Sequence, residues 1–356
     1  MDHKHLENQP WPQEGLERVE RCPICGDVGR TLLHDGLTDK VFFCAPGRWS
    51  LYQCPTCGAA YLDPRPTPAT IAMAYSAYYT HDEVNDIPSG RLGLFKRSLR
   101  NGYLNARYQA HFRPTWGIGR WITRLLPQKR WVDEGVRHLP TTGNPGVLVD
   151  IGCGNGQFLH TAMQLGWDAW GIDLDPKAVE AAQKTGATVI QGGFPDTGLP
   201  SGHFDIVTLN HVIEHVHNPL AALQEAFRVL KPGGKIWIAT PNLESFGHAR
   251  FGSSWRGLEP PRHLVLFTHH SMEKAMISAG FSDIEYKPCP MQASGYYQNS
   301  LRISGGEDPF DDRASTLPLA LRLEALVADL RSVARPSRSE TIVVTATRPP
   351  SNCITT

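Results

Sequence analysis

A strand–loop–helix pattern at residues 147–159, VLVDIGCGNGQFL, constrains the fold of this chain more than any other feature. The apolar run predicts a buried strand, and the loop that follows it contains Gly152, Gly154 and Gly156. Glycines at such a position let the backbone turn tightly and approach a ligand closely at the carboxyl edge of a parallel sheet. The spacing is GxGxG rather than the GxGxxG of a dinucleotide site, and no GK[ST] follows to hold a triphosphate. We therefore expect a loop that binds a nucleotide-like cofactor.

Strands and helices alternate after this loop. Further strands are predicted at DAWGIDL, ATVIQGG, FDIVTLN, KIWIATPN, FSDIEYKP and ETIVVTATR, separated by helical segments. Alternation of this kind indicates an α/β fold with a doubly wound, seven-stranded Rossmann-like sheet, which the last two strands can close as an antiparallel pair.

Two aspartates follow the second strand of this series. Asp173 stands about twenty residues after the glycine loop, where a carboxylate can accept hydrogen bonds from both hydroxyls of a ribose. The alternative is that an aspartate here only caps the next helix. Asp175 directly precedes Pro176 and suits the cap better, because proline is well tolerated in a first helical turn. Asp173 is then left for the ribose.

The order VLVDIGCGNG, GIDLD, FDIVTLNHVIEHV, RVLKPGG and IATPN resembles the class I S-adenosylmethionine-dependent methyltransferases over roughly residues 145–290. The resemblance implies S-adenosylmethionine as cofactor. It also implies which residues surround the amino and carboxylate groups of the cofactor: Asp150, Gly152, Cys153, Gly154 and Gly156.

The same resemblance assigns the remaining cofactor contacts. Asp173 and Leu174 would meet the ribose and the adenine edge. Members of the family often place an acidic residue near the adenine amine, but here Gly193 is followed by Phe194, which would form an apolar wall instead. The residues expected beside the methyl-bearing sulfur are Asn210 and His211.

Methyl transfer is an in-line displacement at a sulfonium carbon, so the enzyme mainly positions the acceptor and removes its proton where necessary. His263, in LEPPRHLVLFT, is the first candidate for the catalytic base, and this phrase resembles the PRH…FT segment of small-molecule and sugar methyltransferases. Histidine titrates near neutrality, which suits this task. His211 is the second candidate, whereas Glu214 and His215 read as structural. The alternative for His263 is that it only fixes its loop together with Arg262.

Two CPxCG turns lie near the N-terminus. Their four cysteines can supply a closed tetrahedral S4 site, which predicts a structural zinc ion rather than a catalytic one. Iron in a rubredoxin-like site is the alternative, and Cys44 is expected to pack as a small apolar residue. A zinc ribbon followed by YLDPRP resembles the N-terminal part of bacterial sugar and secondary-metabolite methyltransferases. The predicted metal ligands are Cys22, Cys25, Cys54 and Cys57.

The segment 91–131 contains many Arg and Lys residues, recurring aromatics and no Asp or Glu. We interpret it as one or two amphipathic helices broken near Pro114, forming a helical cap. Its charges are either simply solvated or bind an anionic acceptor, a membrane surface or RNA. The chain has 35 basic and 35 acidic residues, and this neutral balance argues against nucleic acid as a partner.

These patterns predict four parts. They are a polar leader at 1–20, a zinc ribbon at 21–63, a helical cap and linker at 64–140, and a methyltransferase domain at 141–350. No apolar run is long enough to cross a bilayer and no secretory signal is evident, so we expect a cytoplasmic enzyme. The expected reaction is O-methylation of a small molecule or saccharide. N- or C-methylation, a non-methylating catalyst and an RNA methyltransferase are the alternatives.

Overall fold

The computed structural model describes residues 9–76, 90–125, 128–141, 145–289, 291–311 and 317–350. Its largest sheet has seven strands in the order β12-β13-β10-β9-β6-β7-β8. The strands from β6 to β9 are joined by parallel pairs between β6 and β7, β6 and β9, and β7 and β8. This confirms the α/β fold predicted from the sequence. The strands are β6 (Val147–Ile151), β7 (Asp168–Asp173), β8 (Thr188–Gln191), β9 (Phe204–Asn210), β10 (Leu230–Pro241), β12 (Ser282–Lys287) and β13 (Thr341–Thr347).

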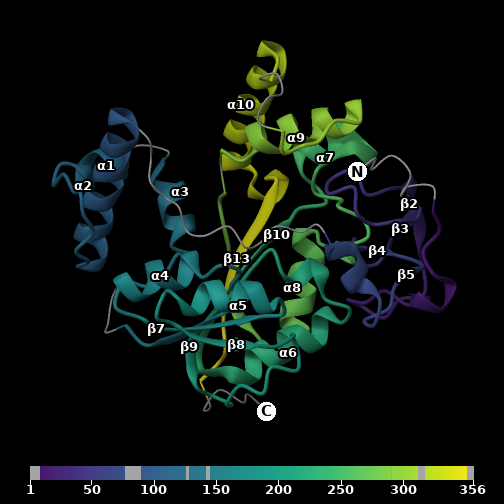
Figure 1. The fold of residues 1–356 in the computed structure, drawn as a ribbon, viewed down its shortest axis with the longest axis horizontal. Helices are drawn as coiled ribbons and strands as arrows, with labels where there is room; N and C mark the ends of the chain where they lie inside the picture. Colours follow the sequence, from purple (N-terminus) through teal and green to yellow (C-terminus); the bar gives the residue numbers. More distant parts are fainter. Residues whose placement is uncertain are drawn as a thin grey trace. The chain divides into compact units, whose positions relative to one another are not determined.

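The strand order reverses beside β6, because β7 and β8 follow it on one side while β9 lies on the other. Open α/β sheets bind ligands at the carboxyl ends of the strands where the order reverses. The glycine loop leaves β6 at this edge and leads into α4 (Gln157–Gln164), which packs against β7 (Figure 1). The topology therefore places the loop where a cofactor is expected.

Helix ends follow the capping chemistry of the sequence. The side chain of Asp175 accepts a hydrogen bond from the Lys177 N–H at 2.9 Å, with Pro176 as the first residue of α5 (Pro176–Gln183). Thr268 and Ser271 form a capping box at the start of α8 (His269–Ser278). The predicted cap at Asp175 is confirmed. The other helices in this part of the chain are α6 (Pro219–Val229), α7 (Phe246–Phe251), α9 (Ala293–Gly305) and α10 (Leu319–Ala334).

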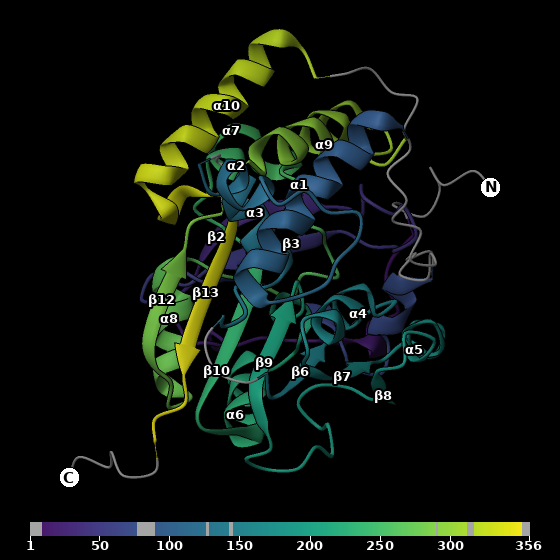
Figure 2. The same ribbon diagram turned by 90° about the vertical axis from the view of Figure 1, so that its left-hand side faces the viewer.

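The chain forms two compact units. One contains the described residues within Met1–Tyr78, His211–Gln224 and Ile238–Ala346. The other contains those within Tyr79–Asn210, Glu225–Trp237 and Thr347–Thr356. In the first unit, β13 lies beside β12, and α9 contacts both α7 and α10 (Figure 2). The four-part division drawn from the sequence stays a prediction.

The cysteine-bearing module is a four-stranded antiparallel sheet within the first unit. Three strands come from the N-terminal region: β2 (Thr31–Leu37), β3 (Trp49–Gln53) and β4 (Ala60–Leu62). The fourth, β11 (Val265–Leu266), belongs to the segment after β10 and pairs with β4. A small sheet of β1 (Leu16–Glu17) and β5 (Arg65–Pro66) accompanies it. Two parts of the chain that are about two hundred residues apart thus share one sheet.

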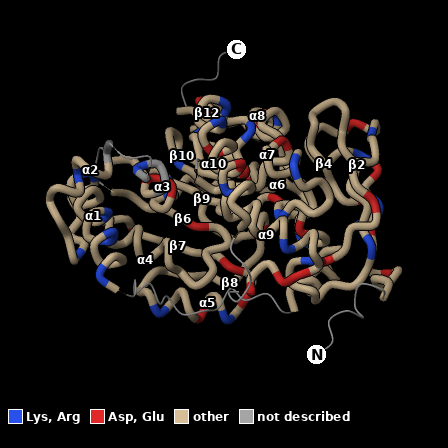
Figure 3. The backbone as a smooth tube through the Cα atoms, turned by 90° about the horizontal axis from the view of Figure 1, so that it is seen from above, with Lys and Arg blue, Asp and Glu red and all other residues tan. Residues whose placement is uncertain are grey.

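The basic segment is helical within the second unit, as predicted, but its described residues form three helices rather than one or two. They are α1 (Arg91–Tyr108), α2 (Gly119–Leu125) and α3 (Gln128–Gly135). The break between α1 and α2 contains Pro114, and Lys and Arg residues are spread along both helices (Figure 3). Tyr103 and Leu104 of α1 are buried in the core of this unit, so α1 is anchored there by its apolar side. Among the described residues, no helix combines the length and the apolar composition that a membrane span requires.

Candidate functional site

The three glycines of the loop after β6 all have left-handed backbones, with φ of 68°, 53° and 79° at Gly152, Gly154 and Gly156. The absence of a Cβ has a different consequence at two of them. A Cβ on Gly156 would lie 2.8 Å from the Cα of Ala182, so this glycine allows α4 and α5 to approach each other closely. A Cβ on Gly154 would meet no atom within 4 Å. Gly154 therefore leaves open space at the sheet edge, which fits a bound ligand.

Asp173 fixes the shape of this loop. One carboxylate oxygen accepts a hydrogen bond from the Gly154 N–H at 2.9 Å, and the other accepts one from the Asp175 N–H at 2.9 Å. Each carboxylate oxygen can accept a second hydrogen bond. Asp173 is half-buried and can thus support the loop and bind hydroxyl groups at the same time.

Asp150 lies at the end of β6 with its side chain fully buried. One oxygen accepts hydrogen bonds from the guanidinium of Arg137 and, at 2.9 Å, from the hydroxyl of Thr208. Its other oxygen, Oδ2, has no hydrogen-bond partner among the described residues. Burial raises the pKa of Asp150, although Arg137 acts in the opposite direction. A buried carboxylate oxygen without a partner suits a cationic hydrogen-bond donor such as an ammonium group.

Arg137 is a site residue that the sequence did not reveal. It follows α3, and its guanidinium lies 3.7 Å from the ring centroid of Phe158. No motif surrounds it, and only the three-dimensional pairing with Asp150 identifies its role.

The remaining residues expected to bind the cofactor occupy differing environments. Cys153 is buried in the core of its unit, and burial raises the pKa of its thiol, so only its backbone is available to a ligand. The side chain of Leu174 is 73% exposed beside Gly193, whose added Cβ would lie 3.2 Å from it. Phe194 is half-buried, and Asn210 is exposed at the end of β9.

His211 directly follows β9 and has a left-handed backbone with φ of 54°. Its N–H donates to the carbonyl of Ala239 at 2.9 Å. Its ring Nδ1 lies 3.2 Å from Oε1 of Glu214, and its side chain is 40% exposed. The imidazole of His211 is therefore accessible, and its Nδ1 contacts the carboxylate of Glu214.

Glu214 is fully buried in the turn η4 (Ile213–His215). Its Oε2 accepts a hydrogen bond from the hydroxyl of Thr240 at 2.9 Å, and its main-chain carbonyl accepts one from the Leu264 N–H at 2.8 Å. Burial alone would raise the pKa of Glu214. The hydrogen bond and charge of His211, together with the neighbouring imidazoles, outweigh burial and lower the pKa to about 2.

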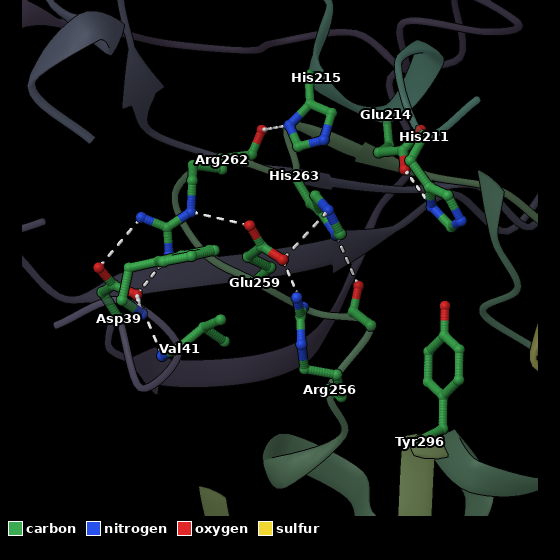
Figure 4. A network of polar contacts seen from close by, with 12 residues as sticks. Asp39, Val41, His211, Glu214, His215, Arg256, Glu259, Arg262, His263 and Tyr296 are labelled. Carbon is green, nitrogen blue, oxygen red and sulfur yellow. Dashed lines mark hydrogen bonds and ion pairs between the residues drawn. The ribbon is translucent and has the colours of Figure 1, made fainter. Parts of the chain in front are cut away.

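His215 and His263 lie against each other, with ring centroids 4.7 Å apart (Figure 4). The Nδ1 of His263 donates to the carbonyl of Gly257 at 2.7 Å. The Nδ1 of His215 lies 3.1 Å from the carbonyl of Arg262 and 3.0 Å from the hydroxyl of Tyr75. Burial lowers the pKa of His263 to about 4, with Glu259 acting in the opposite direction, so its ring is neutral at pH 7.

Buried ion pairs hold the segment that bears His263 onto the cysteine-bearing module. The guanidinium of Arg262, which is fully buried, binds Asp39 and lies 3.0 Å from Glu259. Glu259 also pairs with Arg256. Asp39 lies in the loop between β2 and β3, so Arg262 joins this loop to the segment before β11. Asp39 is a second residue without a recognisable sequence signal.

The four cysteines of the two CPxCG turns converge. Sγ of Cys22 lies 3.5 Å from that of Cys57, and Sγ of Cys25 lies 3.4 Å from that of Cys54. All four sulfurs lie within 4.8 Å of one another. A tetrahedral ion with bonds of about 2.3 Å to sulfur needs sulfur–sulfur distances of about 3.8 Å. The set therefore matches a single zinc ion closely.

Cys44 is half-buried and does not belong to this set. Its Sγ lies 3.4 Å from the carbonyl of Ala74 and 3.8 Å from a guanidinium nitrogen of Arg262.

Residues 123–286 match the family model described as a methyltransferase domain. A ubiquinone biosynthesis O-methyltransferase of Xanthomonas oryzae pv. oryzae (strain PXO99A) is 32% identical over 132 residues, which are 35% of this chain and 54% of that protein. One of the same description from Methylococcus capsulatus is 35% identical over 101 residues, covering 26% and 43%. The chain thus spans about half the length of these relatives.

A solved structure from Thermotoga maritima, described as an S-adenosylmethionine-dependent methyltransferase and possible histamine N-methyltransferase, aligns with 70% of this chain and 98% of its own. The TM-score is 0.41 and the identity 18%. Residues 123–286, just under half of the chain, therefore resemble a methyltransferase domain, and the sheet has the α/β topology described above. Its curated relatives above are O-methyltransferases by name.

Proposed function

We propose that the protein transfers the methyl group of S-adenosylmethionine to a hydroxyl oxygen of a small molecule, such as a saccharide or a precursor of a secondary metabolite. The observation that carries the cofactor part is the loop after β6. Its open glycine, Gly154, lies next to Asp173, and Asp150 offers an unpartnered carboxylate oxygen. The choice of oxygen as acceptor atom rests on the names of the relatives.

Different residues of the proposed site bind different parts of the cofactor. Asp150 binds the ammonium group through Oδ2, and the backbone at Gly152, Cys153, Gly154 and Gly156 surrounds the methionine end. Asp173 binds the ribose hydroxyls. The other contacts, to the adenine and near the sulfur, are assigned to Leu174, Gly193, Phe194, Asn210 and His211. The cofactor supplies a methyl group on a positively charged sulfur, which leaves as a neutral thioether.

His211 is better suited than His263 to take the proton of the acceptor hydroxyl. Its ring is 40% exposed, and the Glu214 carboxylate can stabilise the imidazolium that forms. His263, which the sequence ranks first, is buried and has a lowered pKa, so it is a weak base at neutral pH. We assign His263 to the region that holds the acceptor.

The cysteine cluster binds a structural zinc ion. Its four sulfurs leave no coordination position open for a reacting group. The convergence of all four sulfurs favours metal binding over disulfides, and we propose a reducing compartment such as the cytoplasm.

The test is calorimetric titration of the protein with S-adenosylmethionine and, separately, with NADH. Micromolar binding of S-adenosylmethionine that is lost in Asp173→Ala supports the proposal and justifies a screen of hydroxylated acceptors. An Asp175→Ala variant is the matched control, because the Asp175 side chain caps α5 and the variant should keep the affinity. Binding of NADH without S-adenosylmethionine would overturn the assignment.

A further inference from the structure

Three potential metal ligands that the cofactor site does not use converge in the first unit. They are Glu214 and His215 of η4 and His263, which lies two residues before β11. One ligand atom from each lies within 4.8 Å of the others. The backbone hydrogen bond from the Leu264 N–H to the Glu214 carbonyl joins the two segments, so this convergence is built into the fold.

The tautomers of both histidines favour coordination. A carbonyl oxygen can only accept, so the Nδ1 of His263 donates its hydrogen to Gly257. Nδ1 of His215 has two partners, the hydroxyl of Tyr75 at 3.0 Å and the carbonyl of Arg262 at 3.1 Å, and the carbonyl, which can only accept, favours the hydrogen on Nδ1. Each neutral ring then has its lone pair on Nε2. Metal-binding histidines characteristically donate their other ring N–H to a carbonyl or carboxylate in this way, which fixes the ring and its tautomer.

The carboxylate is oriented too. Oε2 of Glu214 accepts from the Thr240 hydroxyl at 2.9 Å, and Oε1 lies 3.2 Å from Nδ1 of His211. Each oxygen has a further lone pair for an ion. Carboxylates that bind metals are usually hydrogen-bonded from outside as this one is.

The balance of buried charges around this cluster is compatible with a bound cation. The network in Figure 4 contains three buried carboxylates, those of Asp39, Glu214 and Glu259, whereas the guanidiniums paired with them are those of Arg256 and Arg262. Asp39 and Glu259 are neutralised by these arginines. Glu214 is not paired with either arginine; its ion-pair partner is His211, with 3.2 Å between Nδ1 and Oε1. A metal ion at Glu214 would add a second compensating charge beside this buried carboxylate.

We propose that Glu214, His215 and His263 form a second metal site, which binds a divalent ion of the zinc class through one carboxylate and two imidazoles. Three protein ligands leave a coordination position open, as in catalytic zinc sites. The open position would take the oxygen of the acceptor hydroxyl and lower its pKa. This use of the ion rests on the proposed methyl transfer, whereas binding of the ion does not.

The reaction balances without an oxidant or reductant. The acceptor O–H bond breaks and its proton goes to His211. The oxygen then forms a bond to the methyl carbon, while the bond from that carbon to sulfur breaks and its electron pair stays on the neutral thioether.

The test uses the full chain with zinc bound at the four cysteines, titrated with Co²⁺. One further equivalent of cobalt should bind and give weak visible absorption without thiolate-to-cobalt charge transfer. Glu214→Gln and His263→Gln should each weaken this binding by about 100-fold or more. His160→Gln, which replaces an exposed histidine of α4, is the matched control and should bind like the wild type.

X-ray absorption at the cobalt edge of the wild type gives a readout that does not depend on variants folding. Nitrogen and oxygen ligands without sulfur support the site. Binding of no cobalt beyond exchange at the cysteines, or equal binding by the Glu214→Gln and His263→Gln variants, overturns it. Calorimetry with S-adenosylmethionine separates this failure from that of the proposed function, because Asp173 is not a ligand of the ion.

Discussion

At the scale of single residues, the backbone of His211 has a conformation that suits glycine. Its φ of 54° lies in the left-handed region, which costs a residue with a Cβ about 1 kcal/mol. We expect His211→Gly to be more stable than His211→Ala by about 1 kcal/mol, because only glycine adopts this conformation freely. Both variants should lose methyl transfer. Denaturant unfolding and an activity assay check this, and an alanine variant as stable as the glycine variant would contradict the strain.

The two glycines of the cofactor loop should respond differently to alanine. In Gly154→Ala the added methyl group enters open space, so the free energy of unfolding should fall by only about 1–2 kcal/mol, from the left-handed backbone. Gly156→Ala has the same backbone cost and a clash with Ala182, so its destabilisation should be larger. Affinity for S-adenosylmethionine should fall strongly in Gly154→Ala. Thermal melting and calorimetry on both variants separate packing from binding, and equal melting temperatures would contradict this division.

At the scale of elements, the buried pair of Arg262 and Asp39 connects the β2–β3 loop to the segment before β11. Arg262→Met leaves the Asp39 carboxylate buried without its partner, so we expect a loss of about 3–5 kcal/mol in the free energy of unfolding. Arg250→Met is the matched control. Arg250 pairs with Glu324 on the surface, where such pairs contribute less than about 1 kcal/mol. Comparable losses in the two variants would show that the buried pair has no special role.

The proposed zinc ion should stabilise structure beyond the two CPxCG turns that would hold it. The Thr268 hydroxyl, which caps α8, lies 3.4 Å from the carbonyl of Cys57, and β11 pairs with β4 just beyond that turn. Removal of the ion with a strong chelator should therefore lower the melting temperature and increase hydrogen exchange in β4 and β11. Hydrogen-exchange mass spectrometry measures this, and faster exchange limited to the turns themselves would contradict the connection.

The sequence was informative wherever local chemistry determines the structure. The glycine loop, the Asp175 cap and the spacing of the four cysteines depend on neighbouring residues, and each was predicted correctly in its geometry. The pairing of β11 with β4, the partner of Asp150 and the convergence of His215 with His263 were not predicted. Each joins segments that are far apart along the chain or carry no repeated pattern, so periodicity does not reveal them.

At the scale of the whole molecule, buried neutral histidines make stability depend on pH. Burial lowers the pKa of His34, His263 and His269 to about 4, from an ordinary value of 6.5. Between these values the unfolded chain binds more protons than the folded one, so stability rises with pH. We expect these histidines to lower the free energy of unfolding as the pH falls from about 6.5 to about 4, whereas Glu340, whose pKa burial raises to about 7, acts in the opposite direction.

His269 allows this pH dependence to be tested at one position. Its Nδ1 is buried without a hydrogen-bond partner among the described residues, so His269→Phe removes the titrating group without leaving a new unpaired atom. The slope of the unfolding free energy against pH is proportional to the number of protons taken up on unfolding. In His269→Phe this number should decrease by up to about one. His160→Gln, at an exposed position, should leave the slope unchanged. An unchanged slope in His269→Phe would assign the pH dependence to other groups.

The strand that β11 adds to the N-terminal sheet has a consequence for protein engineering. A truncated chain that began after residue 63 would expose the edge of β11 and leave Arg262 without Asp39. The N-terminal region alone would lack its fourth strand. The cysteine-bearing module can therefore not be exchanged between enzymes by cutting the chain at one linker. A graft must carry two stretches of chain together, and natural recombination within this gene would face the same requirement.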